Sequence, residues 1–348
     1  LLNAKGEFIS DTDGKEVLEI AENSDFCFAE VDELGQVRKD DTYIQKHIDA
    51  ILALPLVDVE AIKKANFKVA IDCVNSTGGI FLPPLLKALG VDTVYELYCE
   101  PNGQFPHNPE PLPENLTEIA KIVQQKNADL GIVVDPDVDR LALVNEDGSM
   151  FGEEYTLVAV ADYVLKNTPG NTVSNLSSTR ALRDVTEKAG QQYNAAAVGE
   201  VNVVNQMKAT NAIIGGEGNG GIIYPESHYG RDALVGIALF LSHLAKFGKP
   251  ISVLRASYPS YHISKNKITL TPDMDIDALL KKVEEKYQKQ PYSTIDGLKI
   301  EFDNQWVHLR RSNTEPIIRI YSEAENETTA ENLAQKIISD IKEILQIN

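Results

Sequence analysis

The sequence predicts two tandem mixed α/β domains followed by a smaller α+β domain at the C-terminus. Between residues 67 and 247, short apolar runs alternate with segments of helical periodicity, which is typical of parallel strands joined by right-handed helical crossovers. After residue 252 the predicted strands become neighbours in the sequence and one long helix ends the chain, as in α+β domains. A length of 348 residues is also too great for a single core.

The first α/β domain is predicted over residues 41–152, after a polar and acidic segment over residues 1–40. Its helices are indicated by apolar residues at spacings of three and four, and its strands by short apolar runs. Helices are expected near residues 14–22, within 41–65, up to residue 89 after a tight turn at 75–79, and at 116–126, with strands at 67–73, 91–98, 130–134 and 141–144. Residues 101–113 contain five prolines and are expected to be an irregular connector.

The second α/β domain is predicted over residues 153–255 and the α+β domain over residues 256–348. The second domain repeats the pattern of the first, and the last domain places strands next to one another before its final helix. Helices are expected at residues 155–166, 179–189, 201–208, 231–247, 277–288 and 329–345, and strands at 172–176, 212–216, 221–224, 261–270, 298–302, 306–310 and 317–322.

Three aspartates follow the buried strand LGIVV at alternate positions: Asp135, Asp137 and Asp139. Carboxylates at this spacing just past a strand end can converge on one hard cation, which prefers oxygen ligands. Open α/β sheets also bind their ligands outside the carboxyl ends of their strands. The pattern favours a metal site, and a solvated acidic turn is the alternative.

The same aspartates imitate an EF-hand calcium loop, with Glu146 at the twelfth position. An EF-hand needs glycine at the sixth position for its sharp bend, and here that residue is Arg140. Residues 141–144 read as a strand, where an EF-hand needs a helix. The EF-hand interpretation is therefore rejected.

Composition limits the partners. The formal charge of −19 disfavours nucleic acid and anionic membrane surfaces. The three cysteines lack metal-type spacing, and they favour reduced thiols in a cytoplasm over a disulfide framework. No apolar run reaches transmembrane length. An acidic chain that binds an anion must concentrate its arginines locally.

A glycine-rich stretch, GGEGNGG, follows a predicted strand at residues 212–216. It contains G-x-G-x-x-G, but a dinucleotide site needs a helix directly behind the glycines, and here the strand-like sequence IIYP follows. A hairpin turn is the structural alternative. The functional alternative is a loop that presents Glu217 and Asn219, because a carboxylate beside a carboxamide suits vicinal sugar hydroxyls.

The sequence RRSNTEPIIR supplies the local arginine concentration. One predicted strand ends in Arg310, the turn carries Ser312, Asn313 and Thr314, and the next strand carries Arg319. Guanidinium groups, hydroxyls and free turn N–H groups together favour phosphate binding, although arginines on strands are often merely solvated. The three motifs lie in different predicted domains. A sugar phosphate in an inter-domain cleft would match all three.

Taken in order, DPDVDR, GEGNGG and RRSNTEP resemble the α-D-phosphohexomutases, the phosphoglucomutase/phosphomannomutase superfamily that includes phosphoglucosamine mutase. The resemblance covers essentially the whole chain. It implies domains around a central cleft and intramolecular phosphoryl transfer between the 1- and 6-positions of a hexose or hexosamine phosphate. The reaction would use an active-site phosphoserine and a bisphosphorylated sugar intermediate.

The resemblance also implies roles for individual residues. Asp135, Asp137 and Asp139 would hold Mg²⁺, and Arg140 would orient the transferring phosphoryl group. Glu217 and Asn219 would contact the sugar hydroxyls. The residues expected to bind the non-reacting phosphate are Arg310, Ser312, Asn313, Thr314 and Arg319. Arg311 stands where proline is common in the family and is left out of the site.

Several features depart from the family pattern. The segment NLSST at residues 175–179 lacks a lysine that many phosphomannomutases have, residues 198–200 lack a histidine found in some members, and many relatives have serine in place of Asn219. The missing lysine and histidine favour the phosphoglucosamine mutase side or an archaeal-like mutase. The catalytic serine of the family is expected outside this chain. Residues 1–40 would then be the remnant of the serine-bearing domain, and the chain alone would be inactive.

Two other functions remain as alternatives. A non-catalytic sugar-phosphate binding protein would use the same three motifs without turnover. A nucleotide-dependent oxidoreductase depends on the G-x-G-x-x-G pattern alone. The preferred hexose phosphate and the oligomeric state cannot be read from the sequence, and a cytoplasmic location is expected.

Overall fold

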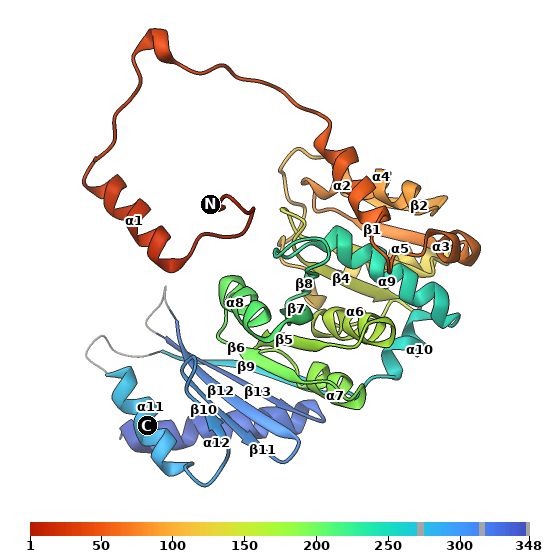
Figure 1. The fold of residues 1–348 in the computed structure, drawn as a ribbon. Helices are drawn as coiled ribbons and strands as arrows, with labels where there is room; N and C mark the ends of the chain where they lie inside the picture. The colour runs from red at the N-terminus through yellow and green to blue at the C-terminus, as the bar shows by residue number, and fades with distance from the viewer. Residues whose placement is uncertain (270–274, 313–316, 346–348) are drawn as a thin grey trace.

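The computed structural model describes residues 1–269, 275–312 and 317–345, and the chain folds into the α/β, α/β and α+β units expected (Figure 1). The first sheet has the order β2-β1-β3-β4, in which β4 runs antiparallel to β3 and the other pairs are parallel. Its strands are β1 (Lys68–Asp72), β2 (Thr93–Leu97), β3 (Leu130–Val134) and β4 (Leu141–Asn145).

The second sheet repeats this topology. Its order is β6-β5-β7-β8, again with only the last strand antiparallel. Its strands are β5 (Asn171–Asn175), β6 (Tyr193–Ala196), β7 (Ala212–Glu217) and β8 (Gly221–Ile223). In both sheets the third strand turns directly into the antiparallel fourth. We name the two connecting loops the aspartate loop (residues 135–140) and the glycine loop (residues 217–221).

The helices of the two α/β units pack around one common apolar core. The long helix α9 (Ala233–Phe247) follows the second sheet in sequence but packs against helices of the first unit and against α6. Besides α9, the helices around the common core are α2 (Tyr43–Leu52), α3 (Val59–Ala65), α4 (Gly78–Ala88), α6 (Glu153–Asn167) and α7 (Ala181–Lys188). On the opposite faces of the sheets, α5 (Thr117–Lys126) and α8 (Glu200–Thr210) close smaller clusters of their own. The shared core holds the two hairpin loops in a fixed relation.

The C-terminal unit is an antiparallel sheet of order β10-β11-β12-β13-β9 with helices on one face (Figure 1). Alternate residues such as Val307 and Leu309 face α11 and α12, and the residues between them face the second α/β unit. The elements are β9 (His262–Thr269), α11 (Ile276–Lys286), β10 (Tyr292–Ser293), β11 (Leu298–Phe302), β12 (Gln305–Arg311), β13 (Ile317–Ala324) and α12 (Glu327–Leu345).

The N-terminal segment lies largely apart from the folded units (Figure 1). It contains α1 (Asp11–Glu22), capped by Ser10, and the 3₁₀ turn η1 (Val31–Glu33), and it contacts α8 where Lys208 pairs with Glu7. A second 3₁₀ turn, η2 (Pro113–Asn115), ends the proline-rich connector.

Among the described residues, the elements not predicted from the sequence are β6, β10, α10 (Ile251–Ala256) and the two 3₁₀ turns. Most predicted ends agree with the structure to within two or three residues.

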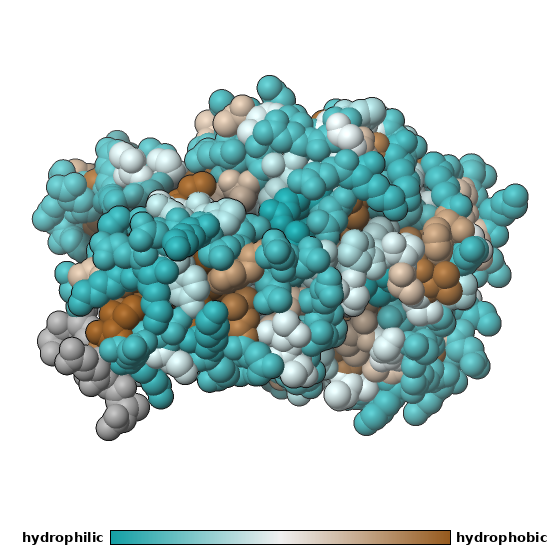
Figure 2. Space-filling view, turned by 90° about the horizontal axis from the view of Figure 1, so that it is seen from below, coloured by the Kyte–Doolittle hydropathy of each residue, from teal (hydrophilic) through white to brown (hydrophobic). Residues whose placement is uncertain are grey.

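The surface seen in Figure 2 is predominantly hydrophilic, with hydrophobic residues in small separate patches. This agrees with the charge of −19. Among the described residues, no helix combines the length and apolar character needed to cross a bilayer.

Candidate active site

The aspartate loop and the glycine loop lie side by side. A backbone bridge pairs Arg140 of one with Gly221 of the other. The contact requires glycine at position 220, because φ there is 88° and a Cβ would lie 2.4 Å from the Leu141 carbonyl oxygen. The structure therefore brings together two motifs that are about 80 residues apart in the sequence.

The aspartate loop gathers its three carboxylates around one point. Oxygens of Asp135, Asp137 and Asp139 lie within 4.8 Å of one another. Asp135 is buried, and its Oδ1 accepts the backbone N–H groups of Asp139 at 3.1 Å and Arg140 at 3.0 Å. Asp137 is exposed, and Val138 adopts a φ of 61° that completes the tight turn. The loop thus holds two carboxylates inside and one at the surface.

These residues fit a divalent cation. Oδ1 of Asp139 is buried without a hydrogen-bond partner. Burial, together with the neighbouring charge of Asp139, raises the pKa of Asp135 to about 7. Clustered carboxylate oxygens are the ligands that Mg²⁺ prefers, and a bound cation would relieve both penalties.

A neighbouring turn supports the aspartate loop. The side chains of Ser76 and Thr77 donate to the carbonyl oxygen of Pro136 at 2.9 and 2.5 Å. From the sequence alone, this turn is expected only to lead into a helix. Its hydroxyl side chains, at the carboxyl end of a neighbouring parallel strand, were the available signal.

The carboxylate of Glu217 is already held by hydrogen bonds within the protein. Its Oε1 accepts the Asn175 amide at 2.8 Å and the Gly199 N–H at 3.2 Å. Its Oε2 accepts Nη1 of Arg231 at 2.7 Å. A carboxylate has about four acceptor positions, so three are filled and one remains for a hydroxyl.

Arg231 joins the two loops, and sequence analysis did not identify it. Besides Glu217, its guanidinium contacts Asp139 of the aspartate loop and Glu200 at 2.9 Å. The side chain is largely buried. A conspicuous Arg-Asp pair directly before an apolar helix was the only signal in the sequence.

Arg310 and Arg319 are direct cross-strand partners on β12 and β13. Arg310 pairs through Nε with Asp296 at 2.7 Å. Ser312 is buried next to them and donates its N–H to the Ile317 carbonyl at 3.0 Å. Arg311 is exposed on the opposite face of the strand. Asn313 and Thr314 lie outside the described residues.

One cleft of about 370 Å³ collects residues from the three units. Its polar lining comes from the aspartate-loop end, the glycine loop and the C-terminal sheet, as expected for a small-molecule site between domains. Five predicted residues line it: Arg140, Glu217, Asn219, Arg310 and Arg319. The three aspartates adjoin the cleft through Arg140, the next residue in the chain.

Three successive segments of the chain match models of the phosphoglucomutase/phosphomannomutase family. The matches are α/β/α domain II over residues 45–148, α/β/α domain III over residues 152–261, and the C-terminal domain over residues 267–339. The chain is also 38% identical over 334 residues to a phosphoglucomutase/phosphomannomutase of Thermococcus kodakarensis, covering 95% of this chain and 72% of that protein. The chain belongs to this family.

Further relatives agree with this assignment to the phosphohexomutases. A phosphoglucosamine/phosphogalactosamine mutase of Sulfurisphaera tokodaii is 32% identical over 317 residues, covering 89% of this chain and 68% of that protein. The solved structure of a phosphoglucomutase/phosphomannomutase family protein from Burkholderia thailandensis has the same fold, with a TM-score of 0.80 and 24% identity over 97% of this chain and 71% of that one. The mutases among these relatives are isomerases.

The two segments that lack the family's lysine and histidine contact the C-terminal unit, since Ser177 meets His308 and the Val198 N–H donates to Asp296 at 3.0 Å. Ser177, in the segment where a lysine is common, hydrogen-bonds His308 Nδ1 at 2.9 Å. Burial lowers the pKa of His308 to about 4. Lys299 donates to the Leu176 carbonyl at 2.8 Å, and burial lowers its pKa to about 8. Polar side chains of the C-terminal sheet thus contact the loop after β5 in the second unit. No local pattern in the sequence indicates these contacts.

The hairpin after β7 excludes the dinucleotide interpretation of the glycine loop. Strand β8 follows the glycines where that fold needs a helix. Likewise, strand β4 follows the aspartates, where an EF-hand would need a helix. The predictions of a strand after the glycine loop and of a strand after the aspartate loop are both confirmed.

Proposed function

We propose that this chain supplies the metal, sugar and distal-phosphate sites of an Mg²⁺-dependent phosphohexomutase, which transfers a phosphoryl group between the 1- and 6-positions of a hexose phosphate through a phosphoserine and a bisphosphorylated intermediate. The observation that carries the proposal is the single cleft lined by Arg140, Glu217, Asn219, Arg310 and Arg319. The proposal assigns these sites to domains over residues 41–152, 153–255 and 256–348.

In the proposed mechanism, Asp135, Asp137 and Asp139 hold Mg²⁺. When bound, the cation neutralises negative charge that develops on the transferring phosphoryl group. The buried Nε of Arg140 lies 3.5 Å from Oδ2 of Asp135. The aspartate loop therefore holds the guanidinium of Arg140 at the edge of the cleft. Arg140 would orient the phosphoryl group from there.

At the middle of the cleft, Glu217 would accept one sugar hydroxyl on its remaining acceptor position, and Asn219 would donate and accept beside it. In the C-terminal part of the lining, Arg310 donates to Asp296 through Nε, so its terminal guanidinium N–H groups would bind the non-reacting phosphate together with Arg319. Ser312, Asn313 and Thr314 complete this proposed phosphate site.

The test is binding of glucose 1-phosphate, mannose 1-phosphate and glucosamine 1-phosphate to the purified chain by calorimetry, with and without Mg²⁺. Arg310→Gln is expected to weaken binding at least about tenfold, the value of one charge-assisted contact. Arg311→Gln is the matched control, since Arg311 is exposed on the opposite face of β12, away from the cleft, and it is expected to leave affinity within about twofold.

Equal effects of the two substitutions would overturn the phosphate assignment. The catalytic serine is expected outside this chain, so turnover is measured on protein that also carries the serine-bearing domain. Turnover there separates the enzyme from a non-catalytic sugar-phosphate binding protein, which would bind without isomerising. A cytoplasmic location stays a prediction.

A further inference from the structure

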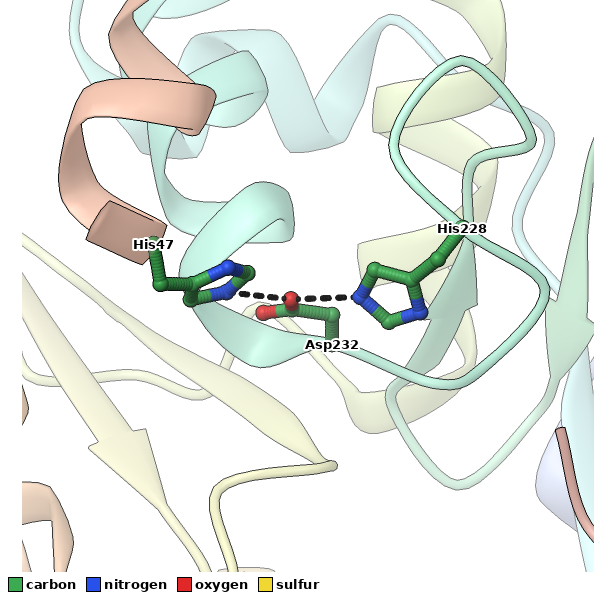
Figure 3. A group of neighbouring side chains, drawn as sticks. All are labelled: His47, His228 and Asp232. Carbon is green, nitrogen blue, oxygen red and sulfur yellow. Dashed lines mark hydrogen bonds and ion pairs between the residues drawn. The ribbon is translucent and has the colours of Figure 1, made fainter. Parts of the chain in front are cut away.

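A second cluster of potential metal ligands lies outside the cleft (Figure 3). His47 comes from α2, His228 from the loop after β8, and Asp232 from the start of α9. Nε2 of His47 lies 2.8 Å from Asp232 Oδ2, and Nε2 of His228 lies 2.9 Å from the same oxygen. Two segments far apart in sequence, α2 and residues 228–232, therefore direct their ligand atoms to one point.

The carboxylate at the centre is held rigidly. Oδ1 of Asp232 accepts the N–H groups of Leu234 and Val235 at 2.8 and 3.1 Å and caps the buried helix α9. Helix capping therefore occupies Oδ1 and leaves Oδ2 between the two imidazoles. Asp232 is also anchored to β8, because its own N–H donates to the Ile222 carbonyl at 2.9 Å.

We propose that His47, His228 and Asp232 bind a divalent transition-metal ion, with Zn²⁺ as the best match. Two imidazoles and a carboxylate are a typical three-residue zinc set, which leaves further positions for water. Tetrahedral ligands about 2.1 Å from one Zn²⁺ ion lie about 3.4 Å apart, so binding would move each imidazole nitrogen about half an ångström farther from Oδ2 than the observed 2.8 and 2.9 Å. Both imidazoles are partly exposed, with side-chain exposures of 31% and 42%, so water can complete the coordination.

This site differs from the aspartate loop in its chemistry. The aspartate loop offers oxygen ligands only, which suit Mg²⁺, whereas imidazole nitrogen favours Zn²⁺ and related ions. The two sites share no residue. Each cation can therefore be titrated in the presence of the other.

The position of the histidine cluster gives the ion a structural effect. The residue before Asp232 is Arg231, which joins the two cleft loops. The residue after it, Ala233, donates its N–H to the Val138 carbonyl of the aspartate loop at 3.1 Å. An ion bound by Asp232 and by His47 of α2 would fix this segment, and with it Arg231, against the first α/β unit.

The experiment uses the metal-free 348-residue chain without a histidine tag, in excess Mg²⁺. Zn²⁺ is titrated by calorimetry and Co²⁺ by visible absorption. One equivalent of each is expected, and the Co²⁺ ligand-field bands should indicate nitrogen ligation. His47→Gln and His228→Gln are each expected to weaken Zn²⁺ binding at least about tenfold through loss of one ligand. Both side chains are partly exposed, so these variants should fold.

His262→Gln, at an exposed position on β9, and Asp137→Asn, in the aspartate loop, are the controls, and both should keep the Zn²⁺ affinity. The proposal is overturned if the parent chain binds no Zn²⁺, or if the double variant His47→Gln/His228→Gln binds it with unchanged stoichiometry and affinity. In the first case the cluster is a hydrogen-bonded contact between α2 and α9, and in the second the ion binds elsewhere.

Discussion

The two α/β units share a sheet topology but use the same hairpin for different chemistry. In the first unit, the loop after the third strand carries three carboxylates, and the buried oxygen Oδ1 of Asp139 has no hydrogen-bond partner. In the second unit, the equivalent loop carries Glu217, whose two oxygens are both engaged by N–H donors. The fold therefore fixes where each loop lies, and the balance of charge differs between them, which is why we propose a cation site in the first loop and a sugar-hydroxyl site in the second.

The second unit also has two different neighbours. It shares an apolar core with the first unit. It meets the C-terminal sheet through polar groups, among them Ser177 with His308, and Arg183 with Glu301 at 3.1 Å. A shared apolar core favours a fixed relation between two units, whereas a polar interface is typical of domains that move relative to one another. We infer that closure of the cleft would come from the C-terminal unit.

The largest effect is expected where the two loops are joined. Arg231→Met removes the positive partner of Asp139, Glu200 and Glu217. Leaving buried carboxylates uncompensated should lower the free energy of unfolding by about 4 kcal/mol. Denaturant unfolding measures this.

The matched control for that prediction is Arg183→Met, which breaks a more exposed pair with Glu301. Its cost should stay within about 1 kcal/mol. Equal costs for the two variants would mean that the loops do not depend on Arg231.

A pH effect should reveal the polar interface of the second unit. Buried His308 stays neutral, with a pKa of about 4 against an ordinary 6.5. Between these two pH values the unfolded chain therefore binds more protons than the folded chain. The free energy of unfolding rises as the pH increases from about 4 to 6.5, and this gain in stability is lost when the pH falls back to about 4. The full change for this group is about 3 kcal/mol.

His308→Gln should flatten that part of the profile, since glutamine does not titrate and can still hydrogen-bond Ser177. The measurement is urea unfolding at several pH values for both proteins. Parallel profiles would show that His308 is protonated in the folded state or does not contribute.

A smaller and more selective effect is expected in the aspartate loop. Asp137 is the exposed member of the proposed Mg²⁺ site, so Asp137→Asn should fold normally and weaken Mg²⁺ binding at least about tenfold. Glu217→Gln, in the equivalent loop of the second unit, should leave Mg²⁺ affinity within about threefold. Calorimetric titration of Mg²⁺ into the two variants tests whether cation binding belongs to one hairpin alone.

Much of this comparison could be predicted from local sequence. The strand before each loop is a short apolar run, and the motifs themselves are contiguous, so their chemistry is visible without a structure. Strand β6 was not predicted because Tyr193–Ala196 has only one fully buried residue and a weak apolar pattern. The roles of Arg231 and His308 could not be predicted for a different reason: the partners that link them to another unit, Asp139 and Ser177, lie 92 and 131 residues away in the chain. No local pattern encodes which distant carboxylate or hydroxyl a side chain will meet.

The smallest effect is expected at the tip of the glycine loop. Asn219 Oδ1 accepts the Gly221 N–H at 3.2 Å, so the side chain both shapes the turn and lines the cleft. Serine can accept the same N–H and still donate to a sugar hydroxyl. Asn219→Ser should therefore change hexose phosphate affinity less than about threefold, whereas Asn219→Ala, which loses both roles, should weaken it about tenfold, near the upper range for one hydrogen bond. Calorimetry with glucosamine 1-phosphate measures the difference, and Mg²⁺ affinity should stay constant in both variants. If alanine were tolerated as well as serine, the glycine loop would act through its backbone alone, and the contrast between the two hairpins would rest on the charge of the aspartate loop.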